Sequence, residues 1–431
     1  MQVEIKQKPV AIVHPPASKR ARLRAFLFDN MVVLLFVLLS AVGVWLSELP
    51  LGFVAMDLVS RIARNGFLIL ALLIPVMAGL GLNFAIVLGA MATQIAVIAV
   101  MHFGIGGLPG VLLTVVLATP MAILFGILIG RLLNKTRGQE MITSMMAGFF
   151  ANGLYMLLLM VMVGTVIPLE NPKLMLPHGI GILSTVDLAI IRQAVDNIHI
   201  MTFAGFMALV AALLGIIGLW THWRQRGTRR PGSHRAAYFA GGAILAGLSS
   251  LLTRSPDSSF AMVSVPLVTF AIIGLGCAFV GFISTTKLGQ DFRTVGQDQH
   301  VAKVSGIDVD RTRLVAMIIS TVMASWGHVL LLSNFGNLST YGSHESVGVF
   351  SIAALLIGGA TVTKATVGQA LTGLILFHTL FLVSPMAGRN LLGDAQLGEF
   401  FRAFVAYGVI AAALAMYAWK RTYAARKQLN S

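Results

Sequence analysis

The sequence contains few charged side chains. Only 11% of its 431 residues are Asp, Glu, Lys or Arg, whereas 57% are hydrophobic and the mean hydropathy is +0.86. A soluble globular protein with an ordinary polar surface does not have this composition. Continuous apolar runs, each long enough to cross roughly 30 Å of hydrocarbon, recur along almost the whole chain and favour helices over barrel strands. We therefore predict an all-α, polytopic helical membrane protein.

Acidic residues are especially scarce. All sixteen fall in predicted tails, loops or span ends, whereas a proton- or sodium-coupled carrier usually keeps a carboxylate in mid-membrane. His102, His328 and His378 are expected to be hydrogen-bonded structural groups, with proton relay as the alternative. Cys277, the single cysteine, lies in an apolar run and is expected to be a small buried hydrophobic residue.

Motifs for catalysis, metal binding and nucleotide binding are missing. The sequence has no G-x-x-x-x-G-K-[ST] phosphate loop, no H-E-x-x-H, no Cys/His metal spacing and no G-x-S-x-G. We expect no catalytic residue, metal site or cofactor in this chain. A transport cycle driven by ATP and Mg²⁺ would therefore need a partner ATPase. The alternative is a secondary carrier or channel that works without ATP and transports a small neutral solute.

About ten to twelve transmembrane helices are predicted. The twelve candidate runs lie near residues 31–48, 66–80, 83–103, 110–131, 141–165, 200–220, 237–253, 261–285, 312–332, 346–362, 366–385 and 400–419. If both termini are cytoplasmic, 24 of the 31 Lys and Arg residues lie on the cytoplasmic side, as the positive-inside rule expects. The formal charge of +15 then indicates orientation in a membrane, and we expect lipids rather than nucleic acid as partners.

This topology divides the chain into regions. A basic cytoplasmic tail (1–30) precedes a transmembrane domain (31–419) and a second basic cytoplasmic tail (420–431). Three loops stand out within the domain: a periplasmic loop at 166–199, a basic cytoplasmic loop at 221–236 and a polar cytoplasmic loop at 286–311. The periplasmic loop is long enough to hold a short helix that covers a pore mouth or meets another protein.

The stretch "AGLGLNFAIVLGAMATQ" joins two apolar runs with almost no loop. It places Gly79, Gly81 and Asn83 at the joint. A broken or re-entrant helix would have this pattern, and a tight cytoplasmic turn between two ordinary helices is the alternative.

Neutral polar side chains are present within the predicted spans. They suit a polar, uncharged ligand, although Ser, Thr and Asn also join membrane helices to one another. We predict that five of them line a substrate pathway: Asn83, Gln94, Asn152, Tyr155 and Ser325.

The stretch "DFRTVGQDQHVAKVSGIDVDRTR", residues 291–313, is the most polar interruption of the apolar pattern. We predict a short helix over 297–305, with Asp298 in its first turn, Lys303 in its last and Gly306 as the left-handed residue that ends it. Such a helix would be a rigid knob that a cytoplasmic partner could grip. The alternative is a solvated connector.

This stretch resembles the coupling segment of ABC importer permeases of the ribose and branched-chain amino acid type. The family pattern is approximately x-R-A-V-G-x-N-x-x-A-A-x-x-x-G-I-x-V, followed by a basic residue and a span. The matching residues here are Arg293, Val295, Gly296, Ala302, Gly306, Ile307, Val309 and Arg313. The run "GVFSIAALLIGGATVTKATVGQALTGLILF" is similar to a second family stretch and matches it at Gly358, Gly359, Gly368 and Gly373. "GLGLNFAIVLGAMATQ" is similar to a third stretch, but Ile86 stands where the family often has a small residue.

The resemblance implies a type II-like permease in a bacterial inner membrane. Two permease subunits, identical or homologous, would form the pathway, and a periplasmic or lipoprotein receptor would deliver the solute. Cytoplasmic ABC ATPases would grip the coupling segment at Arg293, Gly296, Gln297, Asp298, Ala302, Lys303, Gly306 and Ile307. The implied solute is small and polar: a simple sugar or nucleoside first, a branched-chain amino acid next.

Overall fold

The computed structural model describes residues 27–28, 30–196, 200–224, 233–254, 260 and 263–429. Most of the basic tail at 1–30 and much of the basic loop at 221–236 lie outside the described residues. Eight of the described helices are long and apolar enough to cross a membrane, and four shorter apolar helices accompany them. Each of the twelve apolar runs of the sequence overlaps one of these helices, so the predicted class of polytopic helical membrane protein is confirmed.

Three helices and a broken segment form the centre of the bundle. The helices are α3 (Leu51–Ala71), α5 (Val87–His102) and α13 (Val309–Phe335). The broken segment consists of the short helix α4 (Leu73–Met77), which follows α3, and the short 3-10 helix η1 (Phe84–Ile86), which precedes α5. Helix α13 packs against α3, α5 and α6 (Gly107–Lys135). Glycines permit this close packing: a Cβ at Gly89 would lie 2.5 Å from the Thr321 carbonyl oxygen, and one at Gly327 would lie 2.9 Å from Leu68.

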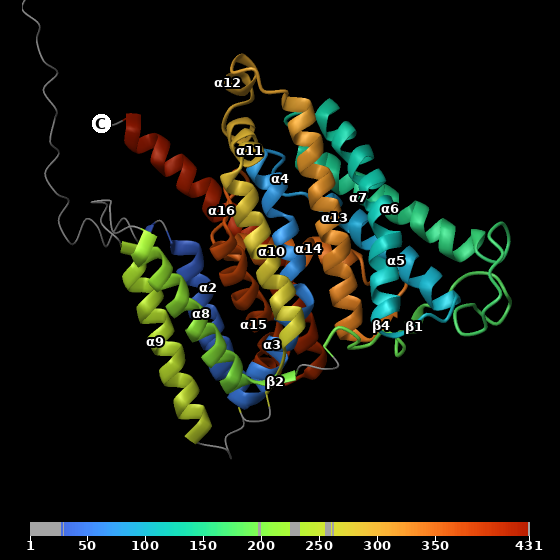
Figure 1. Cartoon of the computed structure of the whole chain (residues 1–431), viewed down its shortest axis with the longest axis horizontal. Helices are drawn as coiled ribbons and strands as arrows, with labels where there is room; N and C mark the ends of the chain where they lie inside the picture. Colours follow the sequence, from blue (N-terminus) through green and yellow to red (C-terminus); the bar gives the residue numbers. More distant parts are fainter. Residues whose placement is uncertain are drawn as a thin grey trace, which may run out of the picture.

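Further helices surround this centre (Figure 1). One group comprises α2 (Met31–Ser47), α14 (Glu345–Ile357), α15 (Val367–Leu392) and α16 (Ala395–Leu429). Helix α7 (Glu140–Leu157) and its continuation η2 (Leu158–Met162) lie against α5 and α6, whereas α10 (Leu267–Thr285) packs separately, against α3. Helices α8 (Phe203–Arg224) and α9 (Ser233–Arg254) form a hairpin at the side of the molecule and pack mainly against each other. The polar stretch forms α11 (Lys287–Gln297) and α12 (Gln299–Val304), which project at one end.

The loop predicted at 166–199 contains no regular α-helix in its described part, residues 166–196. Strand β1 (Thr185–Asp187) instead pairs antiparallel with β4 (Asn337–Ser339), and Val186 lies opposite Leu338. A second ladder joins β2 (Ile200–Thr202) to β3 (Ser264–Pro266), with Met201 opposite Val265. Prolines and glycines along the 166–181 stretch explain the missing helix, because neither residue type supports a helix interior.

The span formed by α3 and α4 begins earlier in the chain than its apolar run, residues 66–80, indicates. The sequence places Arg61 and Arg64 in a loop, but α3 begins at Leu51 and carries both near its middle. Asp57 pairs with Arg61 one turn away at 2.5 Å, so an acidic residue also lies inside this helix. Hydropathy alone began the predicted span at residue 66 because it counts these charges as breaks and cannot detect their pairing.

The joint between α4 and α5 is a buried turn. Gly79 and Gly81 have φ of +71° and +69°, which a residue with a side chain rarely adopts. The turn is covered by protein, since Leu80, Leu82 and Asn83 are each only 1% exposed. The chain reverses direction here, with its backbone enclosed by neighbouring elements instead of open to solvent.

Candidate functional site

A network of polar side chains lies where α5, α7, α13 and α14 meet. His344, which immediately precedes α14, places its Nδ1 3.0 Å from Gln94 Oε1 and its Nε2 2.7 Å from Asn152 Oδ1. Gln94 Nε2 lies 3.3 Å from His328 Nε2, and both of these residues are fully buried. Asn152 donates through Nδ2 to Glu345 Oε1 at 2.6 Å. The network therefore runs from the buried interior at His328 to the carboxylate of Glu345 at the bundle surface.

The network is built mostly from groups that donate and accept without a net charge. A neutral imidazole donates through only one nitrogen, so one of the two amides must turn its NH₂ group toward His344 when that ring is neutral. Gln94 and Asn152 can each present either end of the amide. This arrangement suits hydrogen bonding to hydroxyl, carbonyl or amide groups of an uncharged ligand.

Tyr155 lies against this network. Its ring meets the His344 ring edge-on, with 4.8 Å between the centroids. Its hydroxyl is buried and has no hydrogen-bond partner among the described residues, and the same is true of His328 Nδ1. Tyr155 also lines a cavity of about 160 Å³ whose other lining residues, from α5, α6, α7 and η2, are apolar. The polar atoms left over beside the network are thus a hydroxyl and an imidazole nitrogen.

The structure brings together Gln94, Asn152 and Tyr155 of the five predicted pathway residues. Ser325 lies in the contact between α5 and α13, where its Oγ is 3.0 Å from Thr93 Oγ1. Asn83 lies at the buried turn, and its Oδ1 accepts from the Ala85 N–H at 3.0 Å. These two side chains therefore join or cap helices in the structure, and their place in a pathway stays a prediction.

The sequence reasoning missed His344 and Glu345, and it treated His328 as structural. Both missed residues lie directly before the predicted span that begins at residue 346, and nothing in the local pattern shows that His344 is buried beside α5 and α7. A pair of adjacent polar residues, His344 and Glu345, immediately before an apolar run was the available signal. Among the described residues, no three His, Cys, Asp or Glu side chains form a group that could hold a metal ion.

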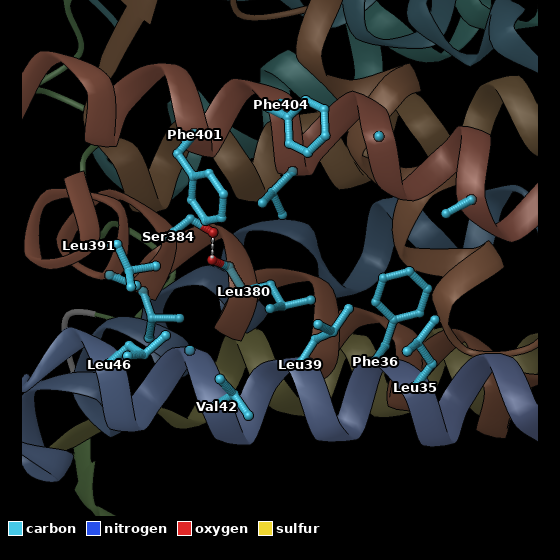
Figure 2. Close-up of a pocket in the computed structure, with 16 residues that line it drawn as sticks. Leu35, Phe36, Leu39, Val42, Leu46, Leu380, Ser384, Leu391, Phe401 and Phe404 are labelled. Carbon is cyan, nitrogen blue, oxygen red and sulfur yellow. Dashed lines mark hydrogen bonds between the residues drawn. The ribbon is translucent and has the colours of Figure 1, made fainter.

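A groove of about 440 Å³ between α2, α15 and α16 has a different character (Figure 2). Leu35, Leu39, Val42 and Leu46 of α2 line one side of it. Ser384 is its one polar side chain, and that hydroxyl donates to the Leu380 carbonyl of its own helix. The groove offers no free hydrogen-bonding group to a polar solute, so we place the candidate site at the His344 network.

The predicted coupling residues form two short helices. Helix α12 runs from Gln299 to Val304, and Asp298 is its N-cap residue instead of a first-turn residue: Oδ1 accepts from the His300 N–H at 2.7 Å and the Val301 N–H at 3.1 Å. These backbone donors hold the pKa of Asp298 below its ordinary value, with Val301 the larger cause. Gly306 has φ of +80° and follows the helix end, as the sequence predicted. The sequence did not predict that residues 287–297 also form a helix, α11.

One face of α12 is anchored and the other is exposed. Ala302 is fully buried and clusters with Val295, Val309 and Ile307. Val301 and Val304 are 51% and 77% exposed. Arg293 lies on α11 and donates to the Ser284 carbonyl at 2.7 Å, whereas Gln297 and Lys303 are exposed. The segment therefore presents an apolar, solvent-facing edge on a fixed base.

Gly296 joins this segment to the buried turn. A Cβ at Gly296 would lie 2.2 Å from the Met77 carbonyl oxygen, and one at Gly79 would lie 2.8 Å from the Gly296 Cα. The backbones of α11 and the α4–α5 joint are therefore in direct contact. The joint leads into α5, which carries Gln94 two turns after its start.

Comparison with known proteins identifies a family. A family model described as branched-chain amino acid transport system / permease component matches residues 66–414. A probable ABC transporter permease protein, y4mJ, of Sinorhizobium fredii is 35% identical over 113 residues, which cover 26% of this chain and 32% of that protein. The autoinducer 2 import system permease protein LsrC of Klebsiella pneumoniae is 24% identical over 157 residues, 36% of this chain and 41% of that protein. The matches thus span less than half of the length of either relative. No solved structure matches the chain.

Proposed function

Because the chain belongs to the branched-chain amino acid transport system permease family, we propose that it is the transmembrane subunit of an ABC importer for a small polar solute. A separate cytoplasmic ATPase hydrolyses ATP, a second permease subunit completes the pathway, and a solute-binding protein delivers the ligand. The orientation is that of the charge distribution, with both termini and α12 in the cytoplasm. The chain itself is then not an enzyme.

The observation that supports coupling is the contact between Gly296 and Gly79. Closure of an ATPase dimer would press on the exposed edge of α12, at Val301 and Val304. Because Ala302 and Gly296 fix α12 and α11 to the bundle, the push would reach the buried turn and α5 instead of bending a loop. This movement of α5 would change the access of the solute to the network around His344.

The uncharged hydrogen-bonding groups of the network support a neutral ligand rich in hydroxyl or amide groups. A simple sugar or nucleoside fits best, followed by a branched-chain amino acid. The name of the Klebsiella relative, an autoinducer 2 import permease, adds a small signalling molecule to the solutes worth testing.

Reconstitution in vesicles tests the proposal. The purified chain alone should take up none of the labelled solutes, and uptake should require the ATPase, the binding protein and ATP. Uptake by the chain alone would contradict the proposal and support an ATP-independent carrier or channel.

A further inference from the structure

A second polar site lies beside the coupling segment. A cavity of about 350 Å³ opens where the ends of α4 and α10 meet α11 and the turn at 361–366. Helices α4, α10 and α11 lie side by side at that end of the molecule (Figure 1). The polar lining consists of Ser284, Arg293, Gln297, Thr363, Lys364 and Thr366. The rest of the lining is glycine or apolar, and it includes Leu73 and Met77.

The cavity is positively charged. Arg293 and Lys364 reach it from two separate elements, and none of the residues that line it is acidic. One NH₂ group of Arg293 donates to the Ser284 carbonyl. This bond holds the guanidinium in place, and its other N–H groups remain available as donors. Lys364 is held through its backbone, whose N–H donates to Thr361 Oγ1 at 3.0 Å, and its ammonium group has no ion pair within the described part of the chain. Two like charges that share a cavity are stabilised by an anion between them.

We propose that this cavity binds a phosphate-bearing anion between Arg293 and Lys364. A guanidinium matches phosphate oxygens with paired N–H groups, and an ammonium group adds a compact positive charge. The hydroxyls of Thr363 and Thr366 and the Gln297 amide supply further donors. The headgroup of an anionic phospholipid and a soluble phosphate compound share this chemistry. The site does not depend on which solute the protein transports.

A bound anion would join two parts of the transport machinery. Arg293 lies on α11, one turn before Gly296, and Lys364 lies in the turn that leads into α15. Both groups would contact the same phosphate, so the anion would hold the coupling segment against the start of α15. We expect occupancy of the cavity to change the rate of coupled uptake without altering which solute is carried.

Cysteine labelling measures occupancy directly. Cys277, which is only partly exposed, is replaced by Ala, and the exposed Thr363 is replaced by Cys as the reporter. The full-length protein is placed in phosphatidylcholine vesicles and labelled with a maleimide. One arm adds inorganic phosphate and the other replaces part of the lipid with phosphatidylglycerol. We expect at least one anion to slow labelling.

Three further variants in this background show whether the protection arises at the site. Lys364→Gln should raise the anion concentration needed for protection by roughly tenfold or more, since it removes a charged hydrogen bond. Lys364→Arg should keep the protection. Arg131→Gln, which removes an exposed positive charge that lies on α6 and does not line the cavity, should leave it unchanged.

The outcomes separate the two sources. Protection by phosphatidylglycerol alone identifies a lipid headgroup, and protection by inorganic phosphate in pure phosphatidylcholine identifies a soluble anion. Absence of protection in both arms would overturn the proposal. Equal protection in the Lys364→Gln and Arg131→Gln variants would also overturn it, because that result reports only general surface charge.

Discussion

His344 contacts the two amides of the polar network with its two ring nitrogens. A side chain in this position fixes the orientation of both Gln94 and Asn152, and it also packs against Tyr155. Gln94 lies on α5, whereas Asn152 and Tyr155 lie on α7, so His344 joins side chains of two helices into one polar surface.

Replacing His344 with Phe should keep the ring contact with Tyr155 and remove both hydrogen bonds. The fully buried Gln94 amide then loses a hydrogen-bond partner, which destabilises the fold by about 1–3 kcal/mol. We expect a lower melting temperature in detergent and a large loss of coupled uptake. Ser384→Ala is the matched control, because its hydroxyl bonds only within its own helix. Normal uptake by His344→Phe would remove this network from the pathway.

Gly296 permits the contact between α11 and the buried turn. Gly296→Ala places a methyl group 2.2 Å from the Met77 carbonyl, and relieving that overlap is expected to destabilise the protein by about 1–3 kcal/mol. The amount of protein inserted in the membrane should fall only slightly, whereas uptake per inserted molecule should fall more. Gly274→Ala on α10 is the control, since nothing lies within 4 Å of the added methyl group. An unchanged ratio of uptake to ATP hydrolysis in Gly296→Ala would contradict a coupling role.

At the scale of elements, α11 and α12 form a bent rod whose geometry depends on capping. Asp298 begins α12, and Gly306 ends it through a bond from its N–H to the Lys303 carbonyl at 3.1 Å. The composition of this stretch predicted a capped helix because N-cap and left-handed glycine signals are local. The anchoring of Gly296 could not be predicted, because its partner Met77 is more than 200 positions away in the chain.

Gly306→Pro tests whether α12 transmits force to the membrane helices. Proline cannot adopt a φ of +80° and has no N–H for the Lys303 carbonyl, so the turn into α13 must rearrange. We expect the variant to insert normally and to hydrolyse ATP with its partner, while uptake is lost. Gly306→Ala should have a milder effect, because it strains the backbone but meets no atom within 4 Å. Coupled uptake at the normal rate in Gly306→Pro would show that α12 does not transmit force.

At the scale of the whole molecule, the hairpin of α8 and α9 is attached through few contacts. Its links to the bundle are the β2–β3 ladder and an apolar cluster around Val59, Val263 and Val265. Thr202 and Ser264 are opposite each other in that ladder, so a two-residue turn can connect them directly.

Replacing residues 203–263 with Asn-Gly should therefore leave the rest of the bundle folded. We expect the melting temperature to fall by no more than a few degrees and coupled uptake to continue, because the centre of the bundle makes no extensive contact with this hairpin. Insertion and thermal unfolding in detergent would be measured for both forms. Collapse of the shortened protein would show that the hairpin is part of the core.

The sequence by itself determined the membrane class, the positions of the apolar helices and the capped form of α12, because hydropathy and capping are properties of neighbouring residues. It began the span formed by α3 and α4 too late in the chain, at residue 66, and placed Arg61 and Arg64 in a loop, since the pairing of Arg61 with Asp57 does not appear in a hydropathy profile. Only the tertiary structure decided which polar side chains meet. Gln94, Asn152 and His344 are separated by 58 to 250 positions along the chain, and they form one network because α14 begins inside the bundle beside α5 and α7.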